Sequence, residues 1–141
     1  MIKNLLQNYI KDYKITLTEN QYEQFQKYFE LLAEWNKKMN LTAITDESGV
    51  ALKHFADSLS LLNFVDIPQN SSLADVGTGA GFPGVVLKIA RPDIKLTLID
   101  SLNKRLVFLG EVCAQLGIEA ELIHSRAEDG ARDEKLGESF D

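Results

Sequence analysis

The stretch Ser72-Leu73-Ala74-Asp75-Val76-Gly77-Thr78-Gly79-Ala80-Gly81-Phe82-Pro83-Gly84 decides the fold of this chain. The apolar residues before the first glycine predict a short buried strand, and the glycines predict a tight turn. The apolar run at 85–90 then predicts a helix whose first amides point back at the turn. A ligand can approach such a turn closely because glycine has no Cβ, and open α/β sheets bind ligands at the carboxyl ends of their strands. We therefore expect a ligand site at this loop.

The spacing of the glycines separates two ligand classes. The dinucleotide fingerprint G-x-G-x-x-G fits Gly77 and Gly79, but Phe82 stands where its third glycine would fall. The stretch instead matches D-x-G-x-G-x-G, from Asp75 to Gly81, and so resembles the first motif of the S-adenosyl-L-methionine-dependent methyltransferases. A carboxylate suits a ligand that carries an amino group and a sulfonium, and it is badly placed against a pyrophosphate. An NAD-dependent oxidoreductase and a turn without any ligand remain the alternatives.

Length and composition are those of one soluble globular domain. The chain has 141 residues, of which 45% are hydrophobic and 26% are charged. No apolar run approaches the roughly 18–20 residues of a membrane span, the N-terminus lacks a signal-peptide pattern, and Cys113 is the single cysteine, so we expect a cytoplasmic setting. A net charge of −6 argues against non-specific nucleic-acid binding but allows RNA docking through a local basic face. Neither histidine has a partner at metal-ligand spacing, so we expect no metal site.

Apolar residues recur at helical spacing through the N-terminal part of the chain. They predict a first helix over residues 2–14 and a second helix that Thr18 caps and that runs to about residue 38. We interpret the aromatic residues of the second helix as core packing rather than as platforms for base stacking. Asp46 or Ser48 can begin a third helix that extends to Leu62.

From residue 73 onward, strands and helices alternate, which is the signature of a parallel sheet. Gly117 stands in the usual position after the end of a helix. The segment 67–72 has the composition of a linker, so we divide the chain into an N-terminal helical region, 1–67, and a partial Rossmann-like cofactor-binding domain, 68–141. In the second part we expect strands at 73–76, 96–99 and 120–124, and helices at 85–90 and 102–116.

Two further segments are placed to contact a nucleoside. Asp100 stands at the end of the second strand, about 20 residues past the glycine loop, where an acid commonly accepts hydrogen bonds from ribose hydroxyls. The alternative is that Asp100 is a solvent-facing acid that caps the next helix at Ser101 and Leu102. Ala127 and Glu128 follow the third strand, where they can border an adenine ring.

Two reactive residue types have ordinary structural interpretations. Cys113 lies on the apolar stripe of a predicted helix, which favours a buried, inert thiol over a nucleophile. His54 can line the cleft beside Asp57 and Ser58, or it can be a buried histidine held by a hydrogen bond.

Four segments of the sequence together carry a specific resemblance to one protein family. The segments 36–44, 54–59, 75–84 and 100–105 resemble motifs of the bacterial glucose-inhibited division protein B family. The resemblance covers nearly the whole chain and implies a class I S-adenosylmethionine-dependent methyltransferase that transfers a methyl group to guanine N7 in 16S ribosomal RNA of the small subunit. Together with the loop motif, it gives a predicted cofactor site of Asp75, Gly77, Gly79, Gly81, Phe82, Asp100, Ser101, Leu102, Ala127 and Glu128.

The implied reaction depends little on acid–base catalysis. The N7 nitrogen of guanine carries a free lone pair, so the transfer needs alignment of the nucleophile with the sulfonium methyl and no general base. The target base must also be unstacked to reach the donor. Candidate contacts to RNA phosphates are Lys37, Lys38, Lys53, Lys104, Arg105 and Arg126.

In the family, the chain continues past Phe140-Asp141 into a fourth strand, followed by an arginine of the cofactor site. We therefore expect an N-terminal portion, truncated after about three strands, in which the edge of the first strand is open. Such an edge can support self-association, and a non-catalytic assembly module is the third possible function. We also expect that this portion binds the cofactor weakly and does not methylate RNA.

Overall fold

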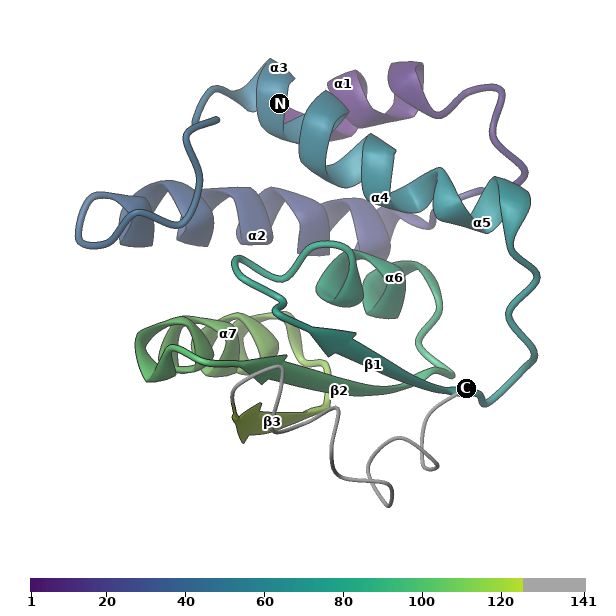
Figure 1. Cartoon of the computed structure of the whole chain (residues 1–141). Coiled ribbons are helices and arrows are strands. Elements are labelled where there is room, and N and C mark those ends of the chain that lie inside the picture. Colours follow the sequence, from purple (N-terminus) through teal and green to yellow (C-terminus); the bar gives the residue numbers. More distant parts are fainter. Residues whose placement is uncertain (126–141) are drawn as a thin grey trace.

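The computed structural model describes residues 1–125. Within that range, the α/β part contains a parallel three-stranded sheet of order β1-β2-β3 (Figure 1). The register pairs Val76 with Ile99 and Asp100 with His124, so the carboxyl ends of the strands lie at one edge. The strands agree with the expected positions to within one residue at each end: β1 Ser72–Val76, β2 Lys95–Asp100 and β3 Ala120–His124.

Two helices connect the strands and cover one face of the sheet. They are α6, Gly84–Ala90, and α7, Asn103–Leu116. Helix α2 (Glu19–Asn36) contacts both of them, which places α6 and α7 on the same side of the sheet. Helix α7 ends where expected, because Gly117 adopts a left-handed conformation with φ of 67°. This α/β arrangement with N-terminal helices is consistent with the class I methyltransferase fold.

The other N-terminal helices form a further layer above α2 (Figure 1). The Thr18 side chain caps α2 in a complete capping box with Gln21, as predicted. Helix α1 (Ile2–Tyr9) is shorter than the expected 2–14, because the backbone leaves the helical conformation at Ile10. The apolar periodicity continues past this point since Tyr13 still packs inward, where its hydroxyl donates to the Ala56 carbonyl oxygen at 3.2 Å.

The third predicted helix is interrupted. Asp46 caps its start, accepting a hydrogen bond from the Gly49 amide at 2.9 Å. The chain then widens into a seven-residue π-helix before returning to α-helical geometry. A 3.6-residue periodicity does not reveal such a widening, because the apolar stripe stays nearly continuous through it. The successive segments are α3 Glu47–Gly49, the π-helix η1 Val50–Ala56, α4 Asp57–Leu59 and α5 Leu61–Phe64.

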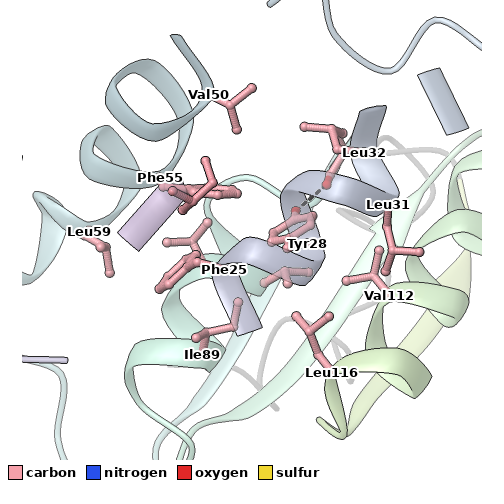
Figure 2. Close-up of a cluster of buried hydrophobic side chains, with 14 of the residues drawn as sticks. Phe25, Tyr28, Leu31, Leu32, Val50, Phe55, Leu59, Ile89, Val112 and Leu116 are labelled. Carbon is pink, nitrogen blue, oxygen red and sulfur yellow. Dashed lines mark hydrogen bonds between the residues drawn. The ribbon is translucent and has the colours of Figure 1, made fainter. Parts of the chain in front are cut away.

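One cluster of buried side chains runs from the N-terminal helices into the α/β part. Figure 2 shows Phe25 and Tyr28 of α2 between Phe55 of η1 and the residues of α6 and α7. Both are 0% exposed, so the aromatic residues of α2 serve the core, as predicted. Cys113 is buried on α7, and burial raises the pKa of its thiol, which agrees with an inert cysteine. The division of the chain at residues 67 and 68 remains a prediction.

The segment that leads into β1 is held by a half-buried ion pair. Arg91 donates to both carboxylate oxygens of Asp93 at 2.9 and 2.8 Å, and also to the Ile67 carbonyl oxygen at 3.0 Å. The Asn70 amide donates to the same Asp93 carboxylate at 2.8 Å. The end of α6 thereby fixes the entry to the sheet. Among residues 1–125, no helix combines the length and the apolar character needed to cross a bilayer.

Candidate functional site

The loop between β1 and α6 is the centre of the candidate site. The amides of Gly77 and Thr78 both donate to the Ile99 carbonyl oxygen, at 2.8 and 3.2 Å, so the loop remains attached to β2 as it leaves the sheet. Gly77, Gly79 and Gly81 have φ values of 69°, 59° and 101°, a region that other residues rarely occupy. The turn therefore requires glycine at all three positions.

The glycines of the loop face two different surroundings. Among the described residues, no heavy atom lies within 4 Å of a Cβ built on Gly77 or Gly79. A Cβ on Gly81 would instead meet Val85 Cγ2 at 2.8 Å and the Tyr28 hydroxyl. We call Gly77 and Gly79 the outer glycines, and Gly81 and Gly84 the inner glycines. The outer glycines present bare backbone to open space, whereas the inner glycines are packed against the protein.

The Asp75 carboxylate supports the loop from within. Its Oδ2 atom accepts hydrogen bonds from the Thr78 hydroxyl at 2.8 Å and from the Gly84 amide at 2.9 Å. Burial raises the pKa of Asp75, these two hydrogen bonds oppose the rise, and the nearby charge of Asp100 adds to it. Asp75 therefore joins the two ends of the loop, and one of its oxygens is already engaged by protein groups.

Asp100 supports the same loop from the neighbouring strand. Its Oδ2 atom accepts from the Gly79 amide at 2.9 Å, and its Oδ1 atom accepts from the Leu102 amide at 2.9 Å. Arg105 Nη1 lies 3.4 Å from Oδ1. The Asp100 residue is 1% exposed, so a ribose hydroxyl could reach the carboxylate only if the surrounding groups shifted. The contact with ribose stays a prediction. The alternative interpretation is wrong in making Asp100 solvent-facing, because the residue is buried, but Asp100 does accept from the Leu102 amide just before α7.

The remaining predicted site residues fall into two groups. Ser101 and Leu102 follow β2 at the same edge as the loop, and both are exposed, Leu102 by 48%. The Ser101 carbonyl oxygen lies 2.9 Å from Nε2 of His124, at the end of β3. Ala127 and Glu128 lie outside the described residues. Within residues 1–125, the structure thus gathers the predicted positions at the carboxyl edge of the sheet.

The first amides of α6 are already hydrogen-bonded by the protein. The Gly84 amide donates to Asp75, and the Val85 amide donates to the Gly81 carbonyl oxygen at 2.9 Å. In dinucleotide-binding folds, the corresponding helix N-terminus holds the pyrophosphate. Here a carboxylate occupies that position, which disfavours an anionic ligand there.

Phe82 connects the loop to the N-terminal helices. Its ring stacks on the His54 ring, with 4.3 Å between the centroids and 9° between the planes. The Tyr28 ring is a second stacked neighbour at 5.6 Å, and the Tyr28 hydroxyl donates to the carbonyl oxygen of Ala80 in the loop. The sequence allows two roles for His54, a position lining the cleft or a buried position held by a hydrogen bond. The structure makes it half-buried and bonded to Thr42, whose Oγ1 atom lies 2.8 Å from Nε2.

Sequence reasoning did not identify the pairing of Thr42 with His54. The available signal was that the two residues fall in separate segments that both resemble the same family, 36–44 and 54–59. Asn36 organises the first segment, because its Oδ1 atom accepts from the amides of Leu41 and Thr42 at 2.8 and 3.0 Å. The first segment therefore contacts the second through Thr42 and His54, and the second contacts the glycine loop through His54 and Phe82.

Comparison with known proteins agrees with this arrangement. The family model described as GidB, rRNA small subunit methyltransferase G, matches residues 21–139. The chain belongs to this family. The family resemblance seen in the sequence is thereby confirmed, and so is the methyltransferase class of the fold.

Individual relatives support the same family. The chain is 52% identical over 132 residues to ribosomal RNA small subunit methyltransferase G of Desulforamulus reducens, covering 93% of this chain and 55% of that relative. It is 55% identical over 132 residues to the protein of the same name from Thermoanaerobacter sp. strain X514, with the same coverage. The Staphylococcus carnosus protein of that name is 51% identical over 120 residues, which are 84% of this chain and 50% of the relative. The chain spans about half the length of the curated relatives it matches.

Proposed function

We propose that residues of this chain bind S-adenosylmethionine for a methyltransferase that modifies guanine N7 in 16S ribosomal RNA. The observation that carries the proposal is the pair of outer glycines, Gly77 and Gly79, whose backbone faces open space at the carboxyl edge of the sheet. A ligand at this position would meet bare backbone on a loop that Asp75 and Asp100 hold rigid. The names of the relatives support ribosomal RNA as the substrate, which also implies action in the cytoplasm.

The charges around the loop favour this donor over NAD. S-adenosylmethionine carries a sulfonium and an amino group, whereas NAD carries an anionic pyrophosphate. Two carboxylates stand beside the loop, and one of them bonds the first amide of α6, where a pyrophosphate would need a free donor. An anion at this edge would be repelled, while a cationic ligand would be attracted. The two carboxylates therefore suit S-adenosylmethionine better than NAD.

The proposed methyl transfer requires the protein to position both reactants. Bound S-adenosylmethionine supplies an electrophilic methyl group, and guanine N7 supplies its own lone pair. The protein must therefore hold the two in line and exclude water, which is work for a rigid loop rather than for a general base. Asp75 and Asp100 contribute rigidity by fixing both ends and the middle of the loop.

Titration with each cofactor tests the proposed binding. We expect calorimetry to detect S-adenosylmethionine binding and no NAD binding, and we expect Gly77→Val to abolish the former while the helical circular dichroism stays nearly unchanged. Gly117→Val is the matched control, because Gly117 has a φ of 67° and open surroundings like Gly77 but caps α7. Unchanged affinity in Gly77→Val, or equal loss in both variants, would contradict the assignment of the loop.

Methyl transfer is a property of the whole protein in this proposal. Because the relatives are about twice as long as the chain, we assign donor binding to the described residues and expect no RNA methylation by the 141 residues alone. A radiolabelled methyl-transfer assay on undermethylated 16S ribosomal RNA would compare the chain with a chimera extended by the remaining residues of the Desulforamulus reducens relative. Transfer by the chimera alone is expected, and efficient transfer by the 141 residues would show that the catalytic half is misplaced.

Self-association through the edge of β1 is a separate prediction. Among the described strands, β1 pairs with β2 and with no other, and Val76 at its end is 52% exposed. Light scattering over a concentration series, with and without S-adenosylmethionine, measures whether the chain associates. A mass of one chain at every concentration would contradict association.

A further inference from the structure

The contact between His54 and Phe82 joins two parts of the molecule that are far apart in sequence. Phe82 belongs to the glycine loop, whereas His54 lies on the π-helix η1. Their rings are nearly parallel, at 9°, with the centroids 4.3 Å apart. Parallel stacking of aromatic rings is favourable beyond the area that it buries. The stack therefore links the position of the loop's Phe82 to that of η1.

The position of His54 is itself fixed by hydrogen bonds. Its Nε2 atom lies 2.8 Å from Oγ1 of Thr42, and that oxygen also accepts from the Ile44 amide at 3.1 Å. The Thr42 amide is in turn bonded to Asn36 at the end of α2. A chain of contacts thus runs from Asn36 through Thr42 and His54 to Phe82.

The backbone that carries His54 is a second, independent indication of function. Residues Val50–Ala56 form a π-helix, whose i→i+5 geometry is rare and occurs frequently at functional sites. Val50 and Phe55 are 0% exposed within the same segment, while His54 is only half-buried. The widened turn thus packs Val50 and Phe55 inward and still presents the imidazole ring to Phe82 of the loop.

We propose that His54 is a positioning residue for binding of the methyl donor: held by Thr42, it fixes the Phe82 ring and with it the inner end of the glycine loop. This inference rests on the proposed function, since the ligand whose binding it governs is S-adenosylmethionine. His54 acts through Phe82 and does not need to touch the donor. The N-terminal helices thereby become part of the donor site, although none of their residues was predicted to bind it.

Three substitutions separate the stack from the hydrogen bond. His54→Ala removes both, His54→Phe keeps an aromatic ring on Phe82, and Thr42→Val removes the hydrogen bond to His54 together with the one that Thr42 Oγ1 accepts from the Ile44 amide. We expect the dissociation constant for S-adenosylmethionine to rise about tenfold in His54→Ala and about threefold in the other two variants. Leu6→Ala is the control for lost stability, because Leu6 is 0% exposed on α1 and has no ring contact with the loop. We expect Leu6→Ala to unfold more easily and to bind the donor as the parent chain does.

Hydrogen exchange of the free protein gives a readout that needs no ligand. The Gly79 amide is bonded to Asp100 and the Gly81 amide to the Thr78 carbonyl oxygen, so both report on the order of the loop. We expect these amides to exchange faster in His54→Ala than in His54→Phe. In Leu6→Ala, once the lower global stability of the variant is taken into account, we expect their exchange rates to match those of the parent chain.

The outcomes distinguish this inference from the proposed function. If the parent chain fails to bind S-adenosylmethionine, the proposed function is wrong, and the exchange rates alone decide the role of His54. Parent-like donor affinity and parent-like loop exchange in His54→Ala would overturn the inference. So would a His54→Phe variant as impaired as His54→Ala, because the stack would then not be the cause. Parent-like donor affinity in Thr42→Val would overturn the role given to Thr42.

Discussion

The outer and inner glycines of one loop meet opposite requirements. Gly77 and Gly79 have nothing within 4 Å of their built Cβ positions among the described residues, whereas a Cβ on Gly84 would lie 2.7 Å from Asp75 Oδ2. The inner glycines are glycine because the protein leaves no room for a side chain. The outer glycines have room, so within the described residues only their backbone conformation constrains them, and the proposed ligand would add a second constraint. The comparison teaches that a glycine-rich motif combines two constraints, of which one concerns packing and the other concerns backbone conformation.

The largest expected effect comes from the inner half of the loop. Gly81→Ala must place a Cβ at a φ of 101° and within 2.8 Å of Val85 Cγ2. Strain and overpacking together are expected to lower the free energy of unfolding by about 3 kcal/mol or more. Gly77→Ala has backbone strain alone and should lose about 1–2 kcal/mol. Urea unfolding followed by circular dichroism measures both, and equal losses would contradict the division of the loop into two halves.

The two carboxylates allow the next comparison. Asp75 accepts both of its hydrogen bonds on Oδ2, so Asp75→Asn can keep both on its amide oxygen. Asp100 accepts on both oxygens, so Asp100→Asn must turn an NH₂ group toward the Gly79 or the Leu102 amide. We expect a loss of about 2 kcal/mol for Asp100→Asn and about half of that for Asp75→Asn, by urea unfolding. The reverse order would show that a charge, rather than the number of accepting oxygens, governs the loop.

Helix α2 stabilises the inner half of the loop through a single hydroxyl. Tyr28 is 0% exposed, and its hydroxyl donates to the carbonyl oxygen of Ala80. Tyr28→Phe keeps the ring stacked on Phe82 but leaves that carbonyl oxygen without this donor, so we expect a loss of about 1 kcal/mol. Thermal and urea unfolding would measure the loss. A variant as stable as the parent chain would show that the hydroxyl contributes nothing to the order of the loop.

Local chemistry made much of the fold predictable. The Thr18 capping box, the left-handed Gly117 and the three strands each depend on a few consecutive residues, and each was expected from the sequence. The glycine loop was likewise predictable, because positive φ values demand glycine at fixed spacing. These features share one property: the residues that decide them are neighbours in the chain.

Features that depend on distant residues were not predictable in the same way. The π-helix η1 leaves the apolar pattern nearly intact, so a single helix was expected in its place. The sequence leaves Asp100 open between a ribose contact and a solvent-facing cap, and no local pattern shows that its carboxylate accepts from the Gly79 amide, 21 residues away in the sequence. The stack of His54 on Phe82 joins two segments whose meeting no local pattern encodes. Burial and tertiary contacts decide these cases.

The smallest expected effect is a difference in how stability depends on pH between the loop carboxylate Asp75 and Asp93, the carboxylate of the Arg91 ion pair. Burial raises the pKa of Asp75 above its ordinary value of 3.8, so the folded state holds the proton more tightly than the unfolded state. The contribution of Asp75 to stability is therefore greatest at acid pH and declines as pH rises from about 3.8 through the raised pKa. The Arg91 guanidinium and the Asn70 amide lower the pKa of Asp93, so its contribution is present above about 3.8 and is lost as pH falls.

Comparing each variant with the parent chain isolates the contribution of one carboxylate to stability from those of the other groups that titrate in the same pH range. The stability difference between the parent chain and Asp75→Asn should shrink as pH rises from about 3.8, because only the parent chain must ionise a buried acid. The difference between the parent chain and Asp93→Asn should grow as pH rises toward 3.8 and then stay level. Since the Asp93 side chain is 23% exposed, solvent screening should limit its plateau to about 1 kcal/mol. Urea unfolding between pH 3 and pH 7 would follow both differences. Parallel slopes for the two variants would mean that the carboxylate inside the loop is solvated like one on the surface, which would remove the electrostatic distinction between the loop and its surroundings.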